Sequence, residues 1–229
     1  MRTSDVVGGT RSIRSGGILQ AQAVSSARRV FGEENSDTIA HMSYLAMLYG
    51  WQCKFEDAGK LYMQALEAPK KMFGGAHTST VCLMHFLAVT YYDLGRYAHA
   101  RPLHAEALGR LRITYGDDHP IAMENMDYLS TCHMYLEDFE AAELLQKQGV
   151  EIKARVHGDE HPITLLGMEK LVSIYLVRDR VQDAASLELL TLEGRRRTLG
   201  PDHPETLTSM RELAALYLHQ DRMKAPGDS

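Results

Sequence analysis

Apolar residues recur along this chain in blocks that share one helical spacing. Each block places side chains at positions i, i+3, i+4 and i+7, which lie on one face of an α-helix. The first block consists of Met42, Leu45, Ala46 and Tyr49. The pattern predicts five equivalent amphipathic helices, each of which we call helix A. The other four blocks follow at intervals of 42 residues: Met84, Leu87, Ala88 and Tyr91; Met126, Leu129, Ser130 and His133; Met168, Leu171, Val172 and Tyr175; Met210, Leu213, Ala214 and Tyr217.

A second apolar stripe follows each complete block after a short polar break, and it predicts a second helix, helix B. Residues 18–31 fit a lone helix B ahead of the first helix A, with Leu19, Ala23 and Val24 in phase. One helix-B position holds alanine in all four complete copies, which predicts close contact between two helices. The clearest copy of the stripe is Tyr97, Ala100, Leu103, Ala107 and Leu108, and the recurring alanines are Ala58, Ala100, Ala142 and Ala184.

A glycine stands directly after every predicted helix B, where a left-handed backbone conformation ends a helix. In three linkers a proline follows four residues later. Proline suits the first turn of the next helix A because its missing N–H costs no hydrogen bond there. The linkers therefore stop one helix and start the next. The glycines are Gly32, Gly74, Gly116, Gly158 and Gly200, and the prolines are Pro120, Pro162 and Pro204.

These elements predict an all-α protein, an α-solenoid in which helix-turn-helix repeats form a right-handed superhelix with a concave helix-A face. The array begins and ends in mid-repeat, which suggests a fragment, a truncated product or part of a larger protein. We expect a flexible leader at 1–17, the array at 18–221 and a flexible tail at 222–229. The array divides into a half repeat at 18–31, full repeats at 32–73, 74–115, 116–157 and 158–199, and a half repeat at 200–221.

The motif L-A-x-x-Y, followed by G-R-Y-x-x-A, A-L and G-x-x-H-P-x-T, resembles the 42-residue tetratricopeptide repeat of the kinesin-light-chain type. The methionine at the head of each block also resembles the arrays of fungal nucleotide-binding receptors. Such a resemblance implies an array that holds peptides or proteins along its helix-A face. Many family members carry an Asn pair just before the Leu-Ala. Here the pairs are Ser43-Tyr44, His85-Phe86, Asp127-Tyr128, Glu169-Lys170 and Arg211-Glu212.

The exposed side of helix A is the candidate partner-binding surface, because aromatic side chains alternate there with polar ones. An alternative is that Tyr44, Phe86 and Tyr128 fill the seam between repeats. Glu124 and Asp127 favour a partner with a basic segment. The candidates are Ser43, Tyr44, Met47, Trp51, His85, Phe86, Val89, Tyr92, Glu124, Asp127, Tyr128, Thr131, Tyr135, Glu169, Lys170 and Ser173.

Composition narrows the range of partners to proteins and peptides. The net charge of −5 gives no basic footprint for nucleic acid, and no apolar run reaches the roughly 20 residues that span a bilayer. Three scattered cysteines are typical of reduced thiols and favour a cytoplasmic protein. The arginine-rich leader is either a targeting signal or a Gly/Ser-rich extension. The last helix A lacks a following helix B, so self-association through this C-terminal helix is a further prediction.

Candidate chemistry is confined to His157-Gly158-Asp159-Glu160-His161, which matches the H-x-x-E-H pattern of zinc peptidases. That pattern needs one continuous helix, whereas Gly158 and Pro162 mark a linker. We therefore predict no catalytic residue, no cofactor and no metal, and expect the recurring linker histidines to cap helix A. The leading hypothesis is a binding scaffold, and one form of it is the repeat array of a larger receptor-like protein. A structural or regulatory segment that holds a neighbouring domain is the alternative, and a zinc hydrolase is a remote one.

Overall fold

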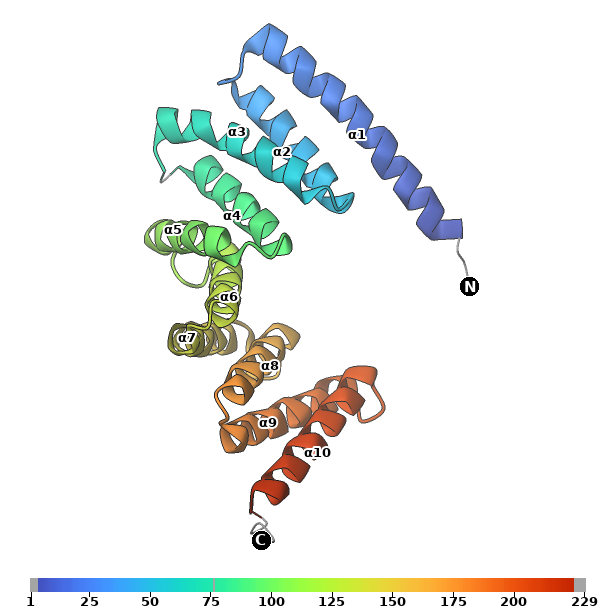
Figure 1. The fold of residues 1–229 in the computed structure, drawn as a ribbon, viewed down its shortest axis with the longest axis vertical. Helices are drawn as coiled ribbons and strands as arrows, with labels where there is room; N and C mark the ends of the chain where they lie inside the picture. Colours follow the sequence, from blue (N-terminus) through green and yellow to red (C-terminus); the bar gives the residue numbers. More distant parts are fainter. Residues whose placement is uncertain (1–3, 76, 225–229) are drawn as a thin grey trace. The chain divides into compact units, whose positions relative to one another are not determined.

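The computed structural model describes residues 4–75 and 77–224, and over these residues it consists of helices without strands (Figure 1). None of the described helices has both the length and the apolarity needed to cross a membrane. The all-helical prediction is thus confirmed. The helices are α1 (Ser4–Phe31), α2 (Ser36–Trp51), α3 (Phe55–Phe73), α4 (Thr78–Asp93), α5 (Tyr97–Tyr115), α6 (Pro120–Tyr135), α7 (Phe139–His157), α8 (Pro162–Val177), α9 (Val181–Leu199) and α10 (Pro204–Lys224).

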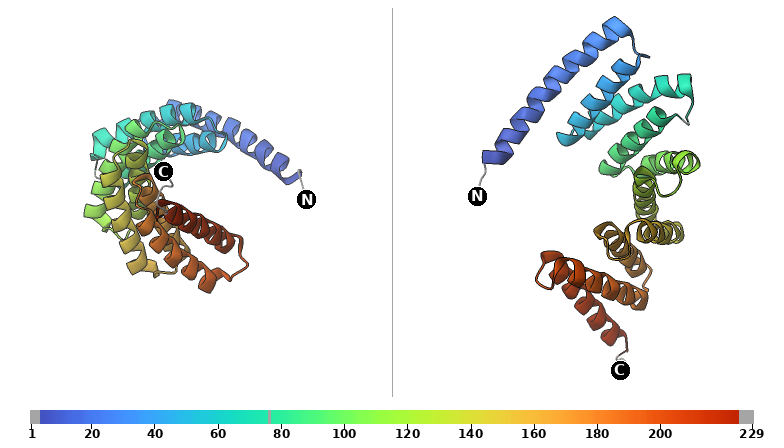
Figure 2. Two further views of the ribbon diagram at one scale, coloured as in Figure 1. Left: turned by 60° about the horizontal axis from the view of Figure 1, so that its bottom comes forward. Right: turned by 180° about the vertical axis from the view of Figure 1, so that it is seen from behind.

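The chain divides into two compact units, residues 1–114 and 115–229, which we call unit 1 and unit 2. In unit 1, α1 packs on α2, α2 on α3 and α3 on α4. In unit 2, each helix from α6 to α9 packs on the next one. Figure 2 shows these neighbouring helices lying side by side within each unit. Helix A of the sequence analysis corresponds to the even-numbered helices, and helix B to the odd-numbered ones.

The predicted core stripes are buried at the interfaces between neighbouring helices. Met42, Met84 and Met126 are buried on three successive copies of helix A, so these methionines are core residues. The recurring helix-B alanines, Ala58, Ala100, Ala142 and Ala184, are also buried. A small side chain at this point allows the two helix backbones to approach closely, as the spacing predicts.

Each linker histidine caps the helix A that follows it. The Nδ1 atom of His77 accepts a hydrogen bond from the backbone N–H of the residue two positions later, at 3.4 Å. His119, His161 and His203 make the same bond at 3.3 Å, and Asn35 makes it at 2.8 Å in the first repeat. These bonds satisfy N–H groups that have no partner within the helix. The prediction that the histidines cap helices is confirmed.

The linker glycines have positive φ angles between 75° and 100°, in the region that side chains with a Cβ rarely adopt. A threonine in the next helix A fixes this turn in three repeats. The hydroxyls of Thr80, Thr164 and Thr206 donate to the carbonyls of the preceding linker glycines at 2.8–3.0 Å. The threonine thus supplies a partner for a carbonyl that the ending helix leaves open.

The turn between helix A and helix B has its own left-handed residue. In the second repeat this residue is Gly95, with φ of 69°. The other three complete repeats place Cys53, Glu137 and Asp179 there, with φ between 57° and 62°. Residues with a Cβ are strained in this conformation, so three of the four turns store a small conformational cost.

The outermost helices extend beyond the predicted array. α1 begins at Ser4, so it includes most of the predicted leader at 1–17, and α10 continues to Lys224, into the predicted tail. The leader contains no proline that would break the helix, and α1 continues in the N-terminal direction although four glycines, Gly8, Gly9, Gly16 and Gly17, disfavour a helix there. Residues 1–3 and 225–229 lie outside the described residues, and so the prediction of flexible ends is not tested there.

Candidate partner-binding face

Three large aromatic side chains are exposed on the helix-A face of unit 1. Tyr44 is 48 % exposed and Trp51 60 % exposed, both on α2, and Phe86 on α4 is 43 % exposed. Phe86 also stacks on Tyr62 of α3, with ring centroids 5.8 Å apart. Phe86 therefore lies on the seam between repeats and still presents part of its ring to solvent, so the two alternatives for it are not exclusive.

The remaining candidates of unit 1 contribute smaller surfaces. Met47 and Val89 are half-buried between the aromatic positions. The Ser43 hydroxyl donates to the Ile39 carbonyl of its own helix at 2.8 Å. Tyr92 is half-buried too, and its ring meets the ring of Tyr97 on α5 edge-on, with centroids 5.4 Å apart. Tyr44, Trp51 and Phe86 are thus the accessible core of the face in unit 1.

His85 was predicted as an accessible site residue, and the structure corrects this. Its side chain is buried, with its ring centroid 5.4 Å from that of Phe86 and 6.0 Å from that of His104 on α5. The position faces helix B of its own repeat, α5, whose His104 ring approaches it. A partner in contact with the exposed face of unit 1 would meet Phe86 and not His85.

Asp127 in unit 2 is an ion-pair partner within the protein. Its carboxylate contacts Lys153 Nζ of α7 at 2.5 Å and Lys170 Nζ of α8 at 3.3 Å. The side chain of Lys153 is only 2 % exposed, so this cation depends on Asp127 for compensation. Two lysines already pair with Asp127, so a basic segment would have to compete with them, and the predicted role of Asp127 in such a site stays a prediction.

The next repeat contains an equivalent pair. Glu169 occupies the position of Asp127 one repeat later, and its carboxylate contacts Arg195 Nη1 of α9 at 2.6 Å. Arg195 takes the place of Lys153 and is buried as well. Arg195 Nη1 also donates to Ser209 Oγ of α10 at 2.6 Å, and its Nε lies 3.7 Å from Glu205. A helix-A acid held by a buried helix-B cation is therefore a repeated feature of unit 2.

A groove of about 430 Å³ opens between α8 and α10 above this second pair. Exposed Ile163 and Leu166 form its apolar part. Leu166 was absent from the predicted site, although it stands one repeat after the candidate Glu124. The groove combines an apolar wall with charged groups, whereas the face of unit 1 is mainly aromatic. It is lined by Pro162, Ile163, Leu166, Glu169, Arg195, Glu205 and Thr208.

The other predicted residues of unit 2 differ in accessibility. Glu124, Tyr135 and Ser173 are exposed, whereas Tyr128 and Thr131 are half-buried. The hydroxyl of Thr131 donates to a backbone carbonyl of its own helix at 2.8 Å, and that of Ser173 does so at 3.2 Å. Tyr135 is thus the most accessible aromatic candidate of this unit.

A polar layer beneath the helix-A face was not predicted. Its members occupy one helix-B position in the four complete repeats, and all are buried: Tyr62, His104, Gln146 and Glu188. The Gln146 amide donates to the Gly167 carbonyl of α8 at 3.0 Å. Burial raises the pKa of Tyr62 to about 12 and is the main cause that raises the pKa of Glu188 to about 7. The 42-residue spacing of these residues is visible in the sequence, but a comparison of apolar positions alone overlooks it.

The segment that matches a zinc-peptidase pattern is a turn between two helices. α7 ends at His157 and α8 begins at Pro162. His161 Nδ1 is used by the backbone N–H of Ile163, and Glu160 pairs with Arg197 at 3.0 Å. Across residues 4–75 and 77–224 no group of three or more His, Cys, Asp or Glu side chains is arranged to hold a metal ion. The two histidines therefore do not lie at the helical spacing that such a metal site needs.

The stacked helix pairs and comparisons with known proteins define the class of this protein. Paired helices stacked in 42-residue units define a helical-repeat protein, a class that typically mediates protein interactions. The family model of the tetratricopeptide repeat matches residues 37–113, 79–155 and 164–205. This chain belongs to the tetratricopeptide repeat family.

Solved structures with the same fold are distant in sequence. A kinesin-light-chain protein of Podosopora anserina with nearly identical TPR-like repeats is 22 % identical, with a TM-score of 0.76 over 83 % of this chain and 90 % of that one. BtubC (BKLC) from P. vanneervenii is 20 % identical, with a TM-score of 0.71 over 90 % and 83 %. Apo RapI is 14 % identical, with a TM-score of 0.73 over 91 % and 55 %. No curated protein sequence matches this chain. These similarities establish the fold.

Proposed function

We propose that this chain is a scaffold that binds a protein or peptide through its helix-A faces. The observation that carries the proposal is the exposure of Tyr44, Trp51 and Phe86 on two consecutive copies of helix A in unit 1. The positions between them hold Ser43, Met47 and Val89, which are uncharged. Membership of the tetratricopeptide repeat family supports a role in protein interaction.

The physical argument is that exposed aromatic side chains gain binding free energy when a partner buries them. Tyr and Trp supply large rigid contact areas and are over-represented among the residues that dominate binding energies. Each aromatic side chain would bury its exposed part against the partner without a charge to desolvate. The face of unit 1 therefore fits a segment with apolar or aromatic side chains. The groove of unit 2 fits a segment that adds polar groups to an apolar one.

The alternative is a structural or regulatory segment that holds a neighbouring domain in place. The same aromatic face would then be covered by that domain and would select no separate partner. A zinc hydrolase is not proposed, because the geometry of the His157–His161 turn gives no support to it. The prediction of a cytoplasmic protein stays a prediction.

Proximity labelling in the native cell first identifies candidate partners. The affinity of each candidate for the wild type is then compared with its affinity for two variants. A double variant, Trp51→Ser with Phe86→Ser, removes the exposed aromatics. The control, Ile113→Ser on α5, removes an apolar side chain that is 89 % exposed and lies on a helix B. We expect the double variant to weaken binding by at least tenfold, which corresponds to about 1.4 kcal/mol, and the control to bind as the wild type does.

Circular dichroism melts of both variants establish that the fold is intact. An unchanged affinity of the double variant for every candidate partner would contradict the proposal for unit 1. If the recovered protein binds the double variant and the wild type equally, but loses affinity when Leu166 or Tyr135 is replaced, the binding face lies in unit 2 instead.

A further inference from the structure

Helix α10 exposes a surface that helix A buries in complete repeats. Tyr217 is 45 % exposed, whereas Tyr175, at the same repeat position in α8, is 8 % exposed. Ala214 is exposed, while its counterpart Val172 is buried. In the complete repeat, α9 follows α8 as helix B and packs on it. Among the described residues, no helix B packs on α10 in this way.

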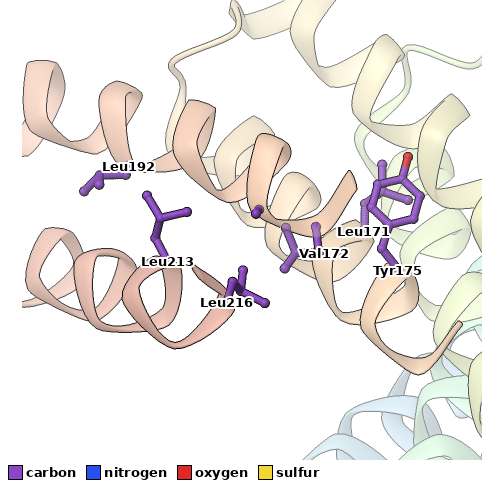
Figure 3. Close-up of a cluster of buried hydrophobic side chains, with 8 residues drawn as sticks. Leu171, Val172, Tyr175, Leu192, Leu213 and Leu216 are labelled. Carbon is purple, nitrogen blue, oxygen red and sulfur yellow. The ribbon is translucent and has the colours of Figure 1, made fainter. Parts of the chain in front are cut away.

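Another side of α10 packs on α9. Leu213 and Leu216 are buried in a cluster that also contains Leu192 of α9 (Figure 3). Figure 3 shows these two leucines on the side of α10 that faces α9. α10 therefore packs on α9 through Leu213 and Leu216 and leaves Ala214 and Tyr217 open.

Helix α1 exposes the complementary surface of a helix B. Leu19 is 67 % exposed, whereas Leu187, at the same repeat position in α9, packs against a buried cluster of α8, α9 and α10 residues that includes Val172. Gly16 stands where α9 has Ala184, which is completely buried. A Cβ added to Gly16 would meet no atom within 4 Å, so there is open space where a helix A would lie.

We propose that copies of this chain associate head to tail, with α1 of one copy packed on α10 of the next as the helix B of the last repeat. The repeat period supports this pairing. α10 begins four residues after Gly200, and α1 ends one residue before Gly32. Together the two helices make up one repeat in the same phase as the rest of the array.

The chemistry of the two surfaces also matches. Within the chain, helix A packs on its own helix B at α2 and α3, at α6 and α7, and at α8 and α9. In the last of these, Val172 and Tyr175 meet the helix that carries Ala184 and Leu187. The proposed junction pairs Ala214 and Tyr217 with Gly16 and Leu19, which are of the same apolar kind. Such a contact joins two different surfaces, so it can continue from copy to copy.

Sedimentation velocity over a wide range of protein concentration tests the proposal. We expect the average mass of the wild type to rise with concentration. Tyr217→Glu and Leu19→Glu should each remain monomeric, because each places a charge in the junction. Both side chains are exposed in a single copy, so neither substitution should unfold it, and a circular dichroism melt verifies this.

A mixture of the two variants gives the decisive result. Each variant keeps one intact surface, so an equimolar mixture should form a dimer and nothing larger. Leu144→Glu is the matched control, because Leu144 is an exposed leucine on helix B of a complete repeat, and this variant should assemble as the wild type does.

Three results would overturn the proposal. One is a wild type that stays monomeric at every concentration. Another is a Leu19→Glu variant that assembles like the wild type, which would indicate a contact between two α10 helices. The third is a mixture of the two variants that contains only monomers.

Discussion

Glu188 makes the stability of unit 2 depend on pH in a direction opposite to that of most carboxylates. Its side chain is completely buried on α9. Burial is the largest cause that raises its pKa, from 4.5 to about 7. The nearby carboxylates of Glu169 and Glu212 raise it further, whereas Ser209 and Arg195 lower it. Between these two pKa values the folded protein therefore holds a proton at this site that the unfolded chain releases.

The sign and size follow from linkage. A group whose folded pKa exceeds its unfolded pKa favours folding most below the unfolded value, and this contribution is lost as the pH rises through the folded value. A difference of about 2.5 pKa units, at about 1.36 kcal/mol per unit, corresponds to roughly 3 kcal/mol. Glu188→Gln keeps a neutral group of the same shape at every pH. We therefore expect the variant to be about as stable as the wild type near pH 4.5 and more stable above pH 7, by up to roughly 3 kcal/mol.

Hydrogen exchange of the α9 and α10 amides is the appropriate measurement, because repeat proteins open locally and the single Trp lies in unit 1. The opening free energy is compared between variant and wild type from about pH 5 to about pH 8, with exchange rates corrected for their intrinsic pH dependence. Glu193→Gln, on the exposed side of the same helix, is the control and should show no such trend. A variant-to-wild-type difference that stays constant over this range would refute the reasoning.

Three further predictions concern local geometry. Glu137→Gly should stabilise unit 2 by about 1 kcal/mol, because residue 137 has φ of 62° and glycine adopts this conformation without strain. Gly95→Ala, at the equivalent turn of unit 1, should destabilise that unit by a similar amount, and thermal melts check both variants. Glu143→Gln should cost about 2 kcal/mol, because this buried carboxylate accepts from two arginines of the α8–α9 turn at 2.7 and 2.8 Å, and urea titration measures the loss. Although burial opposes it, hydrogen bonds from basic side chains lower the pKa of Glu143, so this cost should shrink as the pH falls through the ordinary carboxyl range. His161→Ala should cost at most about 1 kcal/mol in a thermal melt, through the lost cap, and should leave partner binding unchanged.

The fold could be predicted because the same helix-forming and helix-ending residues recur in several copies of the repeat. Glycines with positive φ, prolines at the first helical turn and a 42-residue apolar phase each define one feature of the helix-turn-helix unit. Agreement among copies removes the ambiguity that a single amphipathic stretch would leave. The starting point of α1 was missed because its N-terminal part lies outside the copies that could be compared.

The candidate site was harder to predict, because exposure depends on the neighbouring helix. His85 and Asp127 occupy the same helix-A position, and a pattern on helix A alone places both at the surface. In the structure His104 reaches the first and Lys153 the second. These contacts come from helix B of the same repeat, at positions outside the apolar stripe predicted for that helix. The sequence of one helix does not reveal how far its neighbour's side chains extend.

The position next to the core on helix A carries the clearest argument for a binding role. In successive repeats it holds Tyr44, Phe86, Tyr128, Lys170 and Glu212, while the adjoining core position is leucine in every copy. The packing of the repeat requires the leucine. It does not require an aromatic residue at the neighbouring position in one copy and a charged residue there in another. The backbone at these positions is equivalent, so the variation changes what the surface can contact without changing how it is held. This separation of a constant core from a variable face is the physical basis on which a repeat array selects its partner.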